Sequence, residues 1–301
     1  MTTREDFFAG KGRGHKADPP EVRARMAGFH LLKARRGLSA AALPLSTNNR
    51  QFLQVSAGGP GIRDQKQVGA CEGYANTSGI TLRYALMGTP IPLMSAIGAY
   101  QCALMIQGSF VQGSNTLSDD GTEPNILLQG IQTFGGCSVA TWGNEPATPD
   151  SVIVQPDLAR LEKAATFPLR GAYAIASTGD QYLTDLMIAL AAKYPVTGAI
   201  AASSSTFNNY TGGVLTAMDN NVDHATLWLD YSWDGKNLSS LILFGANSWG
   251  DGLEGDPPWG ESDAPGIAAG MYRGDYAFAN AYNGSSFVID VAPVATGEVE
   301  S

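Results

Sequence analysis

Apolar residues recur at helical spacing through the first half of the chain and gather in short β-rich runs in the second half. The helical spacing predicts helices at 71–87, 93–106, 123–134 and 180–193. The short runs, each bounded by Gly, Pro, Asn or Asp, predict strands at 196–202, 224–232, 238–246 and 276–279. Helices that mostly precede strands indicate an α+β fold from residue 43 onward.

The chain has 301 residues, of which 44% are hydrophobic. That is enough to bury one large core, or two subdomains packed around a cleft. No uncharged apolar run reaches the roughly 18 residues of a membrane span, and the first 14 residues are charged, without the hydrophobic region of a signal peptide. We therefore expect no membrane partner and a protein that is cytoplasmic as synthesised.

Charge separates residues 1–42 from the rest of the chain. This basic N-terminal arm carries nine Lys or Arg against four Asp or Glu, a net charge of +5, whereas the remainder carries −14. The acidic remainder disfavours nucleic acid as a partner of the body of the protein. Residues 20–38 predict a basic amphipathic helix. The arm has three interpretations: a solvated helix on its own domain, a docking arm for a protein assembly, or an inhibitory pro-segment.

Cysteine usage singles out one residue. Three cysteines without CxxC spacing form neither a zinc site nor a disulfide framework, and we find no other metal motif. Cys102 and Cys137 lie in apolar or glycine-rich surroundings and are predicted to be buried, and whether they pair is left open. Cys71 follows Gly69-Ala70 and opens a predicted helix, where unpaired N–H groups and the helix dipole favour a thiolate.

A base and an orienting group follow in the second half. His224 begins one predicted strand, and Asn247 ends the next, so adjacent strands bring both side chains to one end of a sheet. The Asn carboxamide would fix the imidazole tautomer while the other ring nitrogen faces Cys71. Gln65, six residues before Cys71, is placed to join the Cys71 N–H in an oxyanion hole. This set predicts a thiol nucleophile with its base.

These blocks, Asp64-Gln65, Gly69-Ala70-Cys71, Asp223-His224-Ala225 and Asn247-Ser248-Trp249-Gly250, resemble the papain-like (C1 family) cysteine peptidases, especially bacterial and viral members without a long pro-region. The resemblance implies a two-subdomain α+β fold: a helical subdomain, a β-barrel-like subdomain and an active-site cleft between them. It also implies a Cys71–His224–Asn247 triad with Gln65 in the oxyanion hole, peptide or protein substrates, and no cofactor. The corresponding division is the arm 1–42, a mainly helical part 43–160 and a mainly β part 161–301.

Two positions depart from the family pattern: Lys66 stands where Gly usually follows the oxyanion Gln, and Glu72 stands directly after the nucleophile. In the first turn of a helix, Glu72 is expected to face solvent and complement the dipole; pointing inward, it would raise the thiol pKa. The acidic stretch 251–263 predicts a solvated loop. These departures, with the basic arm, motivate an alternative: a structural or binding component of a larger assembly, such as a phage virion, that retains the fold with little turnover.

Overall fold

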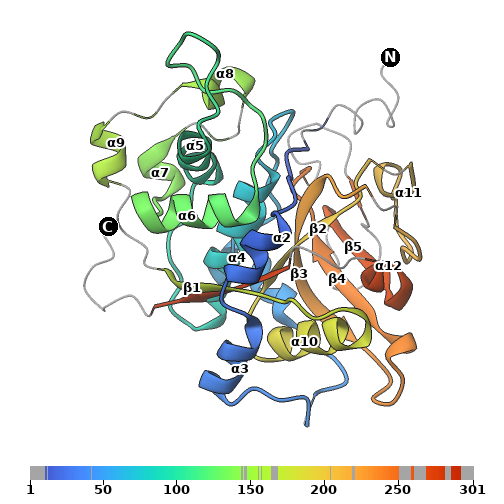
Figure 1. Cartoon of the computed structure of the whole chain (residues 1–301). Helices are drawn as coiled ribbons and strands as arrows, with labels where there is room; N and C mark the ends of the chain where they lie inside the picture. The colour runs from blue at the N-terminus through green and yellow to red at the C-terminus, as the bar shows by residue number, and fades with distance from the viewer. Residues whose placement is uncertain are drawn as a thin grey trace.

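The computed structural model describes residues 11, 13–41, 43–143, 145, 148–154, 156, 158–163, 169–203, 205–218, 221–250, 259–260, 269–281 and 286–292. Helices gather on one side of the molecule and a sheet on the other (Figure 1). None of the helices within these ranges is long and apolar enough to cross a membrane. Most of the predicted acidic loop 251–263 lies outside the described residues.

The helical side is built around α4 (Cys71–Leu86), with α5 (Ala96–Gln107) and α6 (Pro124–Phe134) packed beside it. All of α4 is buried except Ser78 and Arg83, because the sheet covers the face that α5 leaves free. These three predicted helices are confirmed to within a few residues. The short elements around them are η1 (Asn49–Leu53), η2 (Val55–Ala57), α7 (Val139–Trp142), α8 (Pro149–Ile153) and α9 (Leu158–Lys163).

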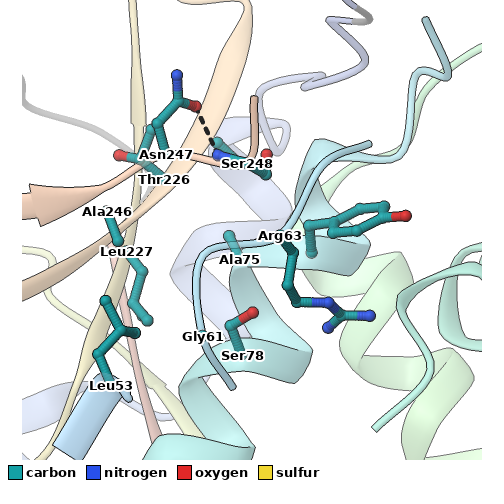
Figure 2. Close-up of a pocket in the computed structure, with 12 residues that line it drawn as sticks. Leu53, Gly61, Arg63, Ala75, Ser78, Thr226, Leu227, Ala246, Asn247 and Ser248 are labelled. Carbon is teal, nitrogen blue, oxygen red and sulfur yellow. Dashed lines mark hydrogen bonds between the residues drawn. The ribbon is translucent and has the colours of Figure 1, made fainter. Parts of the chain in front are cut away.

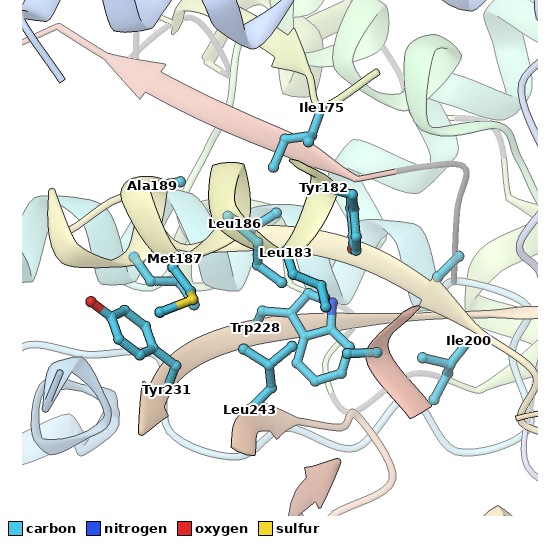
Figure 3. Packing of buried hydrophobic residues seen from close by; sticks show 14 of the residues in the cluster. Ile175, Tyr182, Leu183, Leu186, Met187, Ala189, Ile200, Trp228, Tyr231 and Leu243 are labelled. Atoms are coloured by element: carbon cyan, nitrogen blue, oxygen red, sulfur yellow. The ribbon is translucent and has the colours of Figure 1, made fainter. Parts of the chain in front are cut away.

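Six antiparallel strands form one sheet in the order β1-β6-β2-β3-β4-β5. Their bounds are β1 (Leu169–Ala174), β2 (Val196–Ile200), β3 (His224–Ser232), β4 (Ile242–Ala246), β5 (Met271–Asp275) and β6 (Phe287–Val291). Helix α10 (Gly179–Ala191) lies across β3, with Leu183, Leu186 and Met187 packed near Trp228 and Tyr231 (Figure 3). Helix α11 (Ser205–Asn208) and the 3₁₀ turn η3 (Leu238–Ser240) complete this side. The result is the two-part α+β architecture that the resemblance implies.

The prediction of a strand at 276–279 is wrong. These residues form α12 (Tyr276–Asn280), because the Asp275 side chain accepts the Phe278 N–H at 2.9 Å and caps the helix. The strand lies just before it, as β5. Strands β1 and β6 were not predicted, and 238–246 divides into η3 and β4.

The arm departs from its single predicted helix. It forms α2 (Pro20–Arg25) and α3 (Phe29–Arg36), separated at Gly28, which is extended and bridges to Ala174 of β1. Phe29 and Leu32 are buried in the core beside α10. Lys33 and Arg36 pair with Asp185 and Asp290 at 2.5 and 3.0 Å. The described part of the arm therefore packs on its own domain (Figure 1).

Candidate active site

Cys71 is the first residue of α4, and its side chain is fully buried. The Sγ accepts a hydrogen bond from the backbone N of Gly14 at 3.4 Å, and further backbone hydrogen bonds come from Ala225 and Glu72. Ala225 directly follows His224 at the start of β3. The thiol therefore lies where the N-terminus of α4 meets the first residues of β3.

His224 and Asn247 are brought together by the pairing of β3 with β4. His224 opens β3 and Asn247 follows β4, whose Ala246 is in register with Leu227. The His224 Nε2 lies 2.6 Å from Asn247 Oδ1, and that oxygen also accepts the Ser248 N–H at 2.8 Å. Since Oδ1 is an acceptor, Nε2 carries the proton. Nδ1 has no hydrogen-bond partner in the described parts of the chain.

Burial determines the protonation states of Cys71 and His224. Burial, with the negative charge of Glu72 as the second cause, raises the pKa of the Cys71 thiol to about 12. Burial lowers the pKa of His224 to about 3, and the positive charges of Arg13 and His15 act in the same direction. The structure therefore holds a neutral Cys71 thiol at the N-terminus of α4 and a neutral His224 imidazole at the start of β3. This differs from the thiolate expected at an open helix N-terminus, because Cys71 is buried and Gly14 of the arm contacts its sulfur.

Trp249 and Gln65 surround the pair. The Trp249 ring lies 4.9 Å from the His224 ring between centroids, and Trp249 is 1% exposed. Gln65 is fully buried, and its backbone N–H donates to Ser248 O at 2.9 Å. Its side-chain Nε2 donates to Val68 O at 2.8 Å, and its Oε1 accepts the Ser248 hydroxyl. Gln65 thus ties the loop before Cys71 to the loop that carries Asn247.

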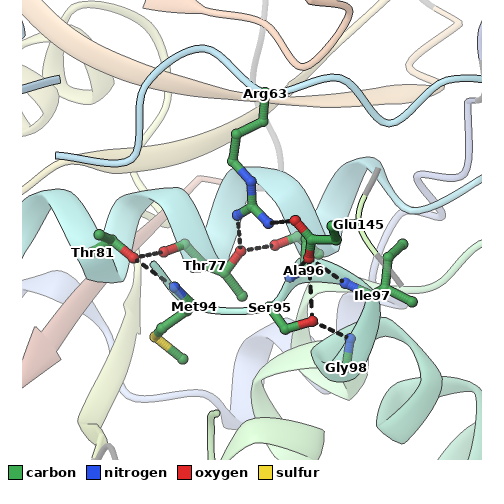
Figure 4. A network of polar contacts seen from close by, with 10 residues as sticks. Arg63, Thr77, Thr81, Met94, Ser95, Ala96, Ile97, Gly98 and Glu145 are labelled. Carbon is green, nitrogen blue, oxygen red and sulfur yellow. Dashed lines mark hydrogen bonds and ion pairs between the residues drawn. The ribbon is translucent and has the colours of Figure 1, made fainter. Parts of the chain in front are cut away.

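Arg63 anchors that first loop to the helical side. Its guanidinium donates to Thr77 Oγ1 at 2.9 Å, pairs with Glu145, and lies 4.6 Å from the centre of the Tyr74 ring. Glu145 in turn accepts the Ala96 N–H at 2.7 Å at the start of α5 (Figure 4). This network joins the loop, α4 and α5 behind the candidate site.

A small pocket lies at the seam between α4 and the sheet. Ala75 and Ser78 line it from α4, Leu227 and Ala246 line it from the strands, and Asn247 closes one end (Figure 2). Asn247 therefore both accepts the hydrogen bond from His224 and lines this pocket.

Residues 11 and 13–18 of the arm, here called the covering segment, lie over Cys71. Their backbone runs parallel to residues next to α6: Thr122 N–H donates to Gly14 O at 2.7 Å, and Lys16 N–H donates to Thr122 O at 3.0 Å. On the sheet side, His15 N–H donates to Asp223 O at 3.3 Å. Gly14 is required here, since a Cβ would lie 1.7 Å from the carbonyl oxygen of Gly69. The segment thus bridges the helical side and the sheet across Cys71.

The side chains of the covering segment meet acidic groups of the body. Lys11 Nζ lies 2.8 Å from Asp64 Oδ2, and Arg13 Nε lies 3.9 Å from Asp223 Oδ2. His15 Nδ1 lies 2.6 Å from Glu72 Oε1, with the His15 side chain 0% and the Glu72 side chain 2% exposed. The expectation that Glu72 faces solvent is therefore wrong. The arm covers the face of α4 that carries Glu72. Rules based only on the residues within a helix take no account of such a contact.

The other departure, Lys66, has a backbone reason. Its φ is 54°, in the left-handed region where glycine is at no steric disadvantage, which accounts for a Gly being usual there. Lys66 N–H donates to Asp64 Oδ1 at 2.7 Å, and this bond helps to hold the turn.

Sequence reasoning brought out Cys71, His224, Asn247 and Gln65 but missed Gly14, His15 and Arg63. The glycines at 10, 12 and 14 among basic residues were the available signal for the covering segment. Nothing local to Arg63 marks it as an anchor. Cys102 and Cys137 are buried beside Trp142 and are not joined by a disulfide. Among the described residues, no group of three or more His, Cys, Asp or Glu is placed to hold a metal ion.

Known proteins are similar to this chain in one segment of sequence and in fold. Residues 163–262 match the family described as papain family cysteine protease. No curated protein sequence matches the chain. The fold is similar to xylellain, a cysteine protease from Xylella fastidiosa, with a TM-score of 0.68 and 18% identity over 94% of this chain and 97% of that one.

Two further structures are also similar in fold. Digestive procathepsin L 3 from the larval midgut of Tenebrio molitor has a TM-score of 0.62 and 20% identity over 96% of this chain and 79% of that one. Bromelain from Ananas comosus, in complex with the E64 inhibitor, has a TM-score of 0.59 and 19% identity over 83% of this chain and 100% of that one. Residues 163–262 thus match the papain family of cysteine proteases, and the chain has the fold that these papain-like proteins share.

Proposed function

We propose that Cys71 is the nucleophile, His224 its base and Asn247 the residue that orients the base, in hydrolysis of peptide bonds. The observation that carries this proposal is the 2.6 Å bond from His224 Nε2 to Asn247 Oδ1, which leaves Nδ1 without a partner among the described residues at the point where β3 meets Cys71. A base whose far nitrogen is fixed by an amide keeps the tautomer needed to take a thiol proton.

The reaction then proceeds in two steps. Nδ1 of His224 takes the proton of Cys71, whose sulfur attacks the peptide carbonyl, and the imidazolium returns that proton to the leaving amine. Water, deprotonated by the same imidazole, hydrolyses the thioester and releases the acid. The Cys71 N–H at the start of α4 and Gln65 Nε2 are assigned to the oxyanion. Gln65 Nε2 donates to Val68 O in this arrangement, so this role requires the amide to be shared or turned once substrate is bound.

We also propose that the covering segment is an inhibitory pro-segment that takes the place of substrate. Three features support this role: its backbone contacts on both sides of Cys71, the glycine at the point of closest approach, and the neutral state of the buried pair. Displacing the segment would return water to Cys71 and His224, so the thiol pKa would fall and the imidazole pKa would rise.

The test is labelling of Cys71 by an epoxide of the E64 type at pH 6, followed by mass spectrometry. In a full-length Gly14→Val variant, Cys71 should react at least about a hundredfold faster than Cys102 or Cys137, because only Cys71 has a base. Adding His224→Ala should slow the labelling of Cys71 alone. Equal reactivity of the three thiols in Gly14→Val, or no effect of His224→Ala, would overturn the assignment.

A structural role in a larger assembly, such as a virion, stays a prediction, as does docking of the arm to a protein partner. The contacts of α3 and the covering segment with the body favour the inhibitory role over docking. A full-length protein that cleaves no peptide even after its covering segment is displaced would favour the assembly role.

A further inference from the structure

The contacts of the Glu72 carboxylate have no role in the proposed hydrolytic reaction. Its carboxylate is buried directly beside the candidate nucleophile, with Oε2 accepting from Asn76 Nδ2 at 2.8 Å and Oε1 paired with His15 Nδ1 at 2.6 Å. The first partner belongs to α4 and stays in place. The second belongs to the covering segment and leaves with it.

The backbone around His15 is held by hydrogen-bonding groups of the body that could hold any extended peptide in the same way. Thr122 offers an N–H and a carbonyl, and Asp223 offers a carbonyl, within hydrogen-bonding distance of Gly14, His15 and Lys16. These bonds do not depend on side chains, as in other cases of strand addition. A substrate lying on the same groups therefore brings one of its side chains to the place of the His15 ring.

The Glu72 carboxylate, lying beside the position of the His15 ring, would favour a positively charged substrate side chain there. Once the covering segment has gone, Glu72 Oε1 lacks its partner, and a neutral substrate side chain would rebury it unpaired, which is unfavourable. A cationic side chain of similar reach restores the pair. The pairs of Lys11 with Asp64 and of Arg13 with Asp223 extend the same acidic surface along every second residue of the segment.

We infer that Glu72 is a specificity-determining residue, which selects substrates carrying a cationic side chain, with imidazolium as the best-matched group, where His15 lies in the covered protein. This inference rests on the proposed function, because it assigns the substrate of the same site. In the covered protein, His15 then occupies the position of that substrate side chain.

The test compares two peptidyl epoxides that differ only in carrying histidine or leucine, placed at the first or the second residue from the epoxide. Second-order rates of Cys71 labelling are measured in full-length Gly14→Val at pH 5.5, where a free imidazole is mostly protonated. In one of the two placements, the histidine probe should react at least about tenfold faster than the leucine probe. In Gly14→Val with Glu72→Gln, that ratio should fall to about one.

Glu123→Gln is the matched control, because it removes a nearby carboxylate whose charge acts on Asp18, whereas the carboxylate paired with His15 is that of Glu72. It should leave the preference intact. If circular dichroism shows that Gly14→Val does not fold, the ratio is measured in His15→Leu, which removes the pair to Glu72 instead.

The outcomes separate the inference from the function it rests on. Equal rates for the two probes in both placements, or a preference that survives Glu72→Gln, would overturn the role of Glu72 and leave the nucleophile assignment standing. Failure of both probes to label Cys71 in a folded, opened variant would overturn the proposed function and the inference with it.

Discussion

The backbone nitrogen of Gly14 lies 3.4 Å from the sulfur of Cys71, although 57 residues separate them in the chain. An N–H donated to sulfur stabilises negative charge there, yet the same approach excludes water, and burial is the larger effect on the thiol pKa. The Gly14–Cys71 hydrogen bond alone would favour the thiolate, but it belongs to a closed state in which the covering segment buries the sulfur.

Gly14→Ala should open that state. The added Cβ would lie 1.7 Å from Gly69 O, so the covering segment must move away from Cys71. We expect epoxide labelling of Cys71 at pH 6 to rise at least about tenfold, with the melting temperature nearly unchanged because Phe29 and Leu32 still hold the arm. Gly171→Ala is the control, since its Cβ would meet only ordinary contacts at 3.4 Å. Unchanged labelling in Gly14→Ala would contradict a closed covering segment.

Asn247→Ala should lower kcat by about a hundredfold in the opened protein, with KM close to that of the parent, because the imidazole loses its orienting acceptor and not a substrate contact. Steady-state hydrolysis of a peptide by Gly14→Ala, with and without Asn247→Ala, measures this loss. Asn48→Ala, at an exposed position, is the matched control. Parental turnover in the Asn247 variant would refute the orienting role.

Much of the candidate site could be predicted because its signals are local. A small residue before Cys71 marks a helix start, and a strand that opens with His224 beside one that ends at Asn247 brings their side chains to one edge. Cys71 begins α4, and His224 Nε2 lies 2.6 Å from Asn247 Oδ1. Their catalytic roles remain for the experiments above.

Other features were missed because their causes are not local. Glu72 obeys the rule for a first helical turn, yet its partner His15 comes from a segment 57 residues away. Strand β1 is paired on one side by β6, which ends the described chain more than a hundred residues later. The strand predicted at 276–279 is a helix because an apolar run of that length does not distinguish a strand from a capped helix.

Arg63→Met should destabilise the protein without touching the reacting groups. The substitution leaves the Glu145 carboxylate buried without its cation and removes the donor to Thr77. We expect unfolding to become easier by about 3 kcal/mol, as is usual when one partner of a buried ion pair is lost. Chemical denaturation followed by circular dichroism measures this change, with the exposed Arg170→Met as control. A loss no larger than that of the control would show that the network contributes little.

Asp18→Asn should make closure of the covering segment less sensitive to pH. Burial, then the charges of Glu72 and Glu123, raises the pKa of Asp18 from 3.8 to about 6, against the opposing effects of the Asn125 N–H and His15. The closed state thus binds this proton more tightly than an open state, so closure is favoured below about pH 4 and weakens as pH rises through 6. The ratio of Cys71 labelling rates, native over Asp18→Asn, should be close to one at pH 4 and at least about tenfold at pH 7. The ionisation of the thiol is common to both proteins and cancels from this ratio, so a ratio that stays flat from pH 4 to 7 would show that Asp18 does not govern closure.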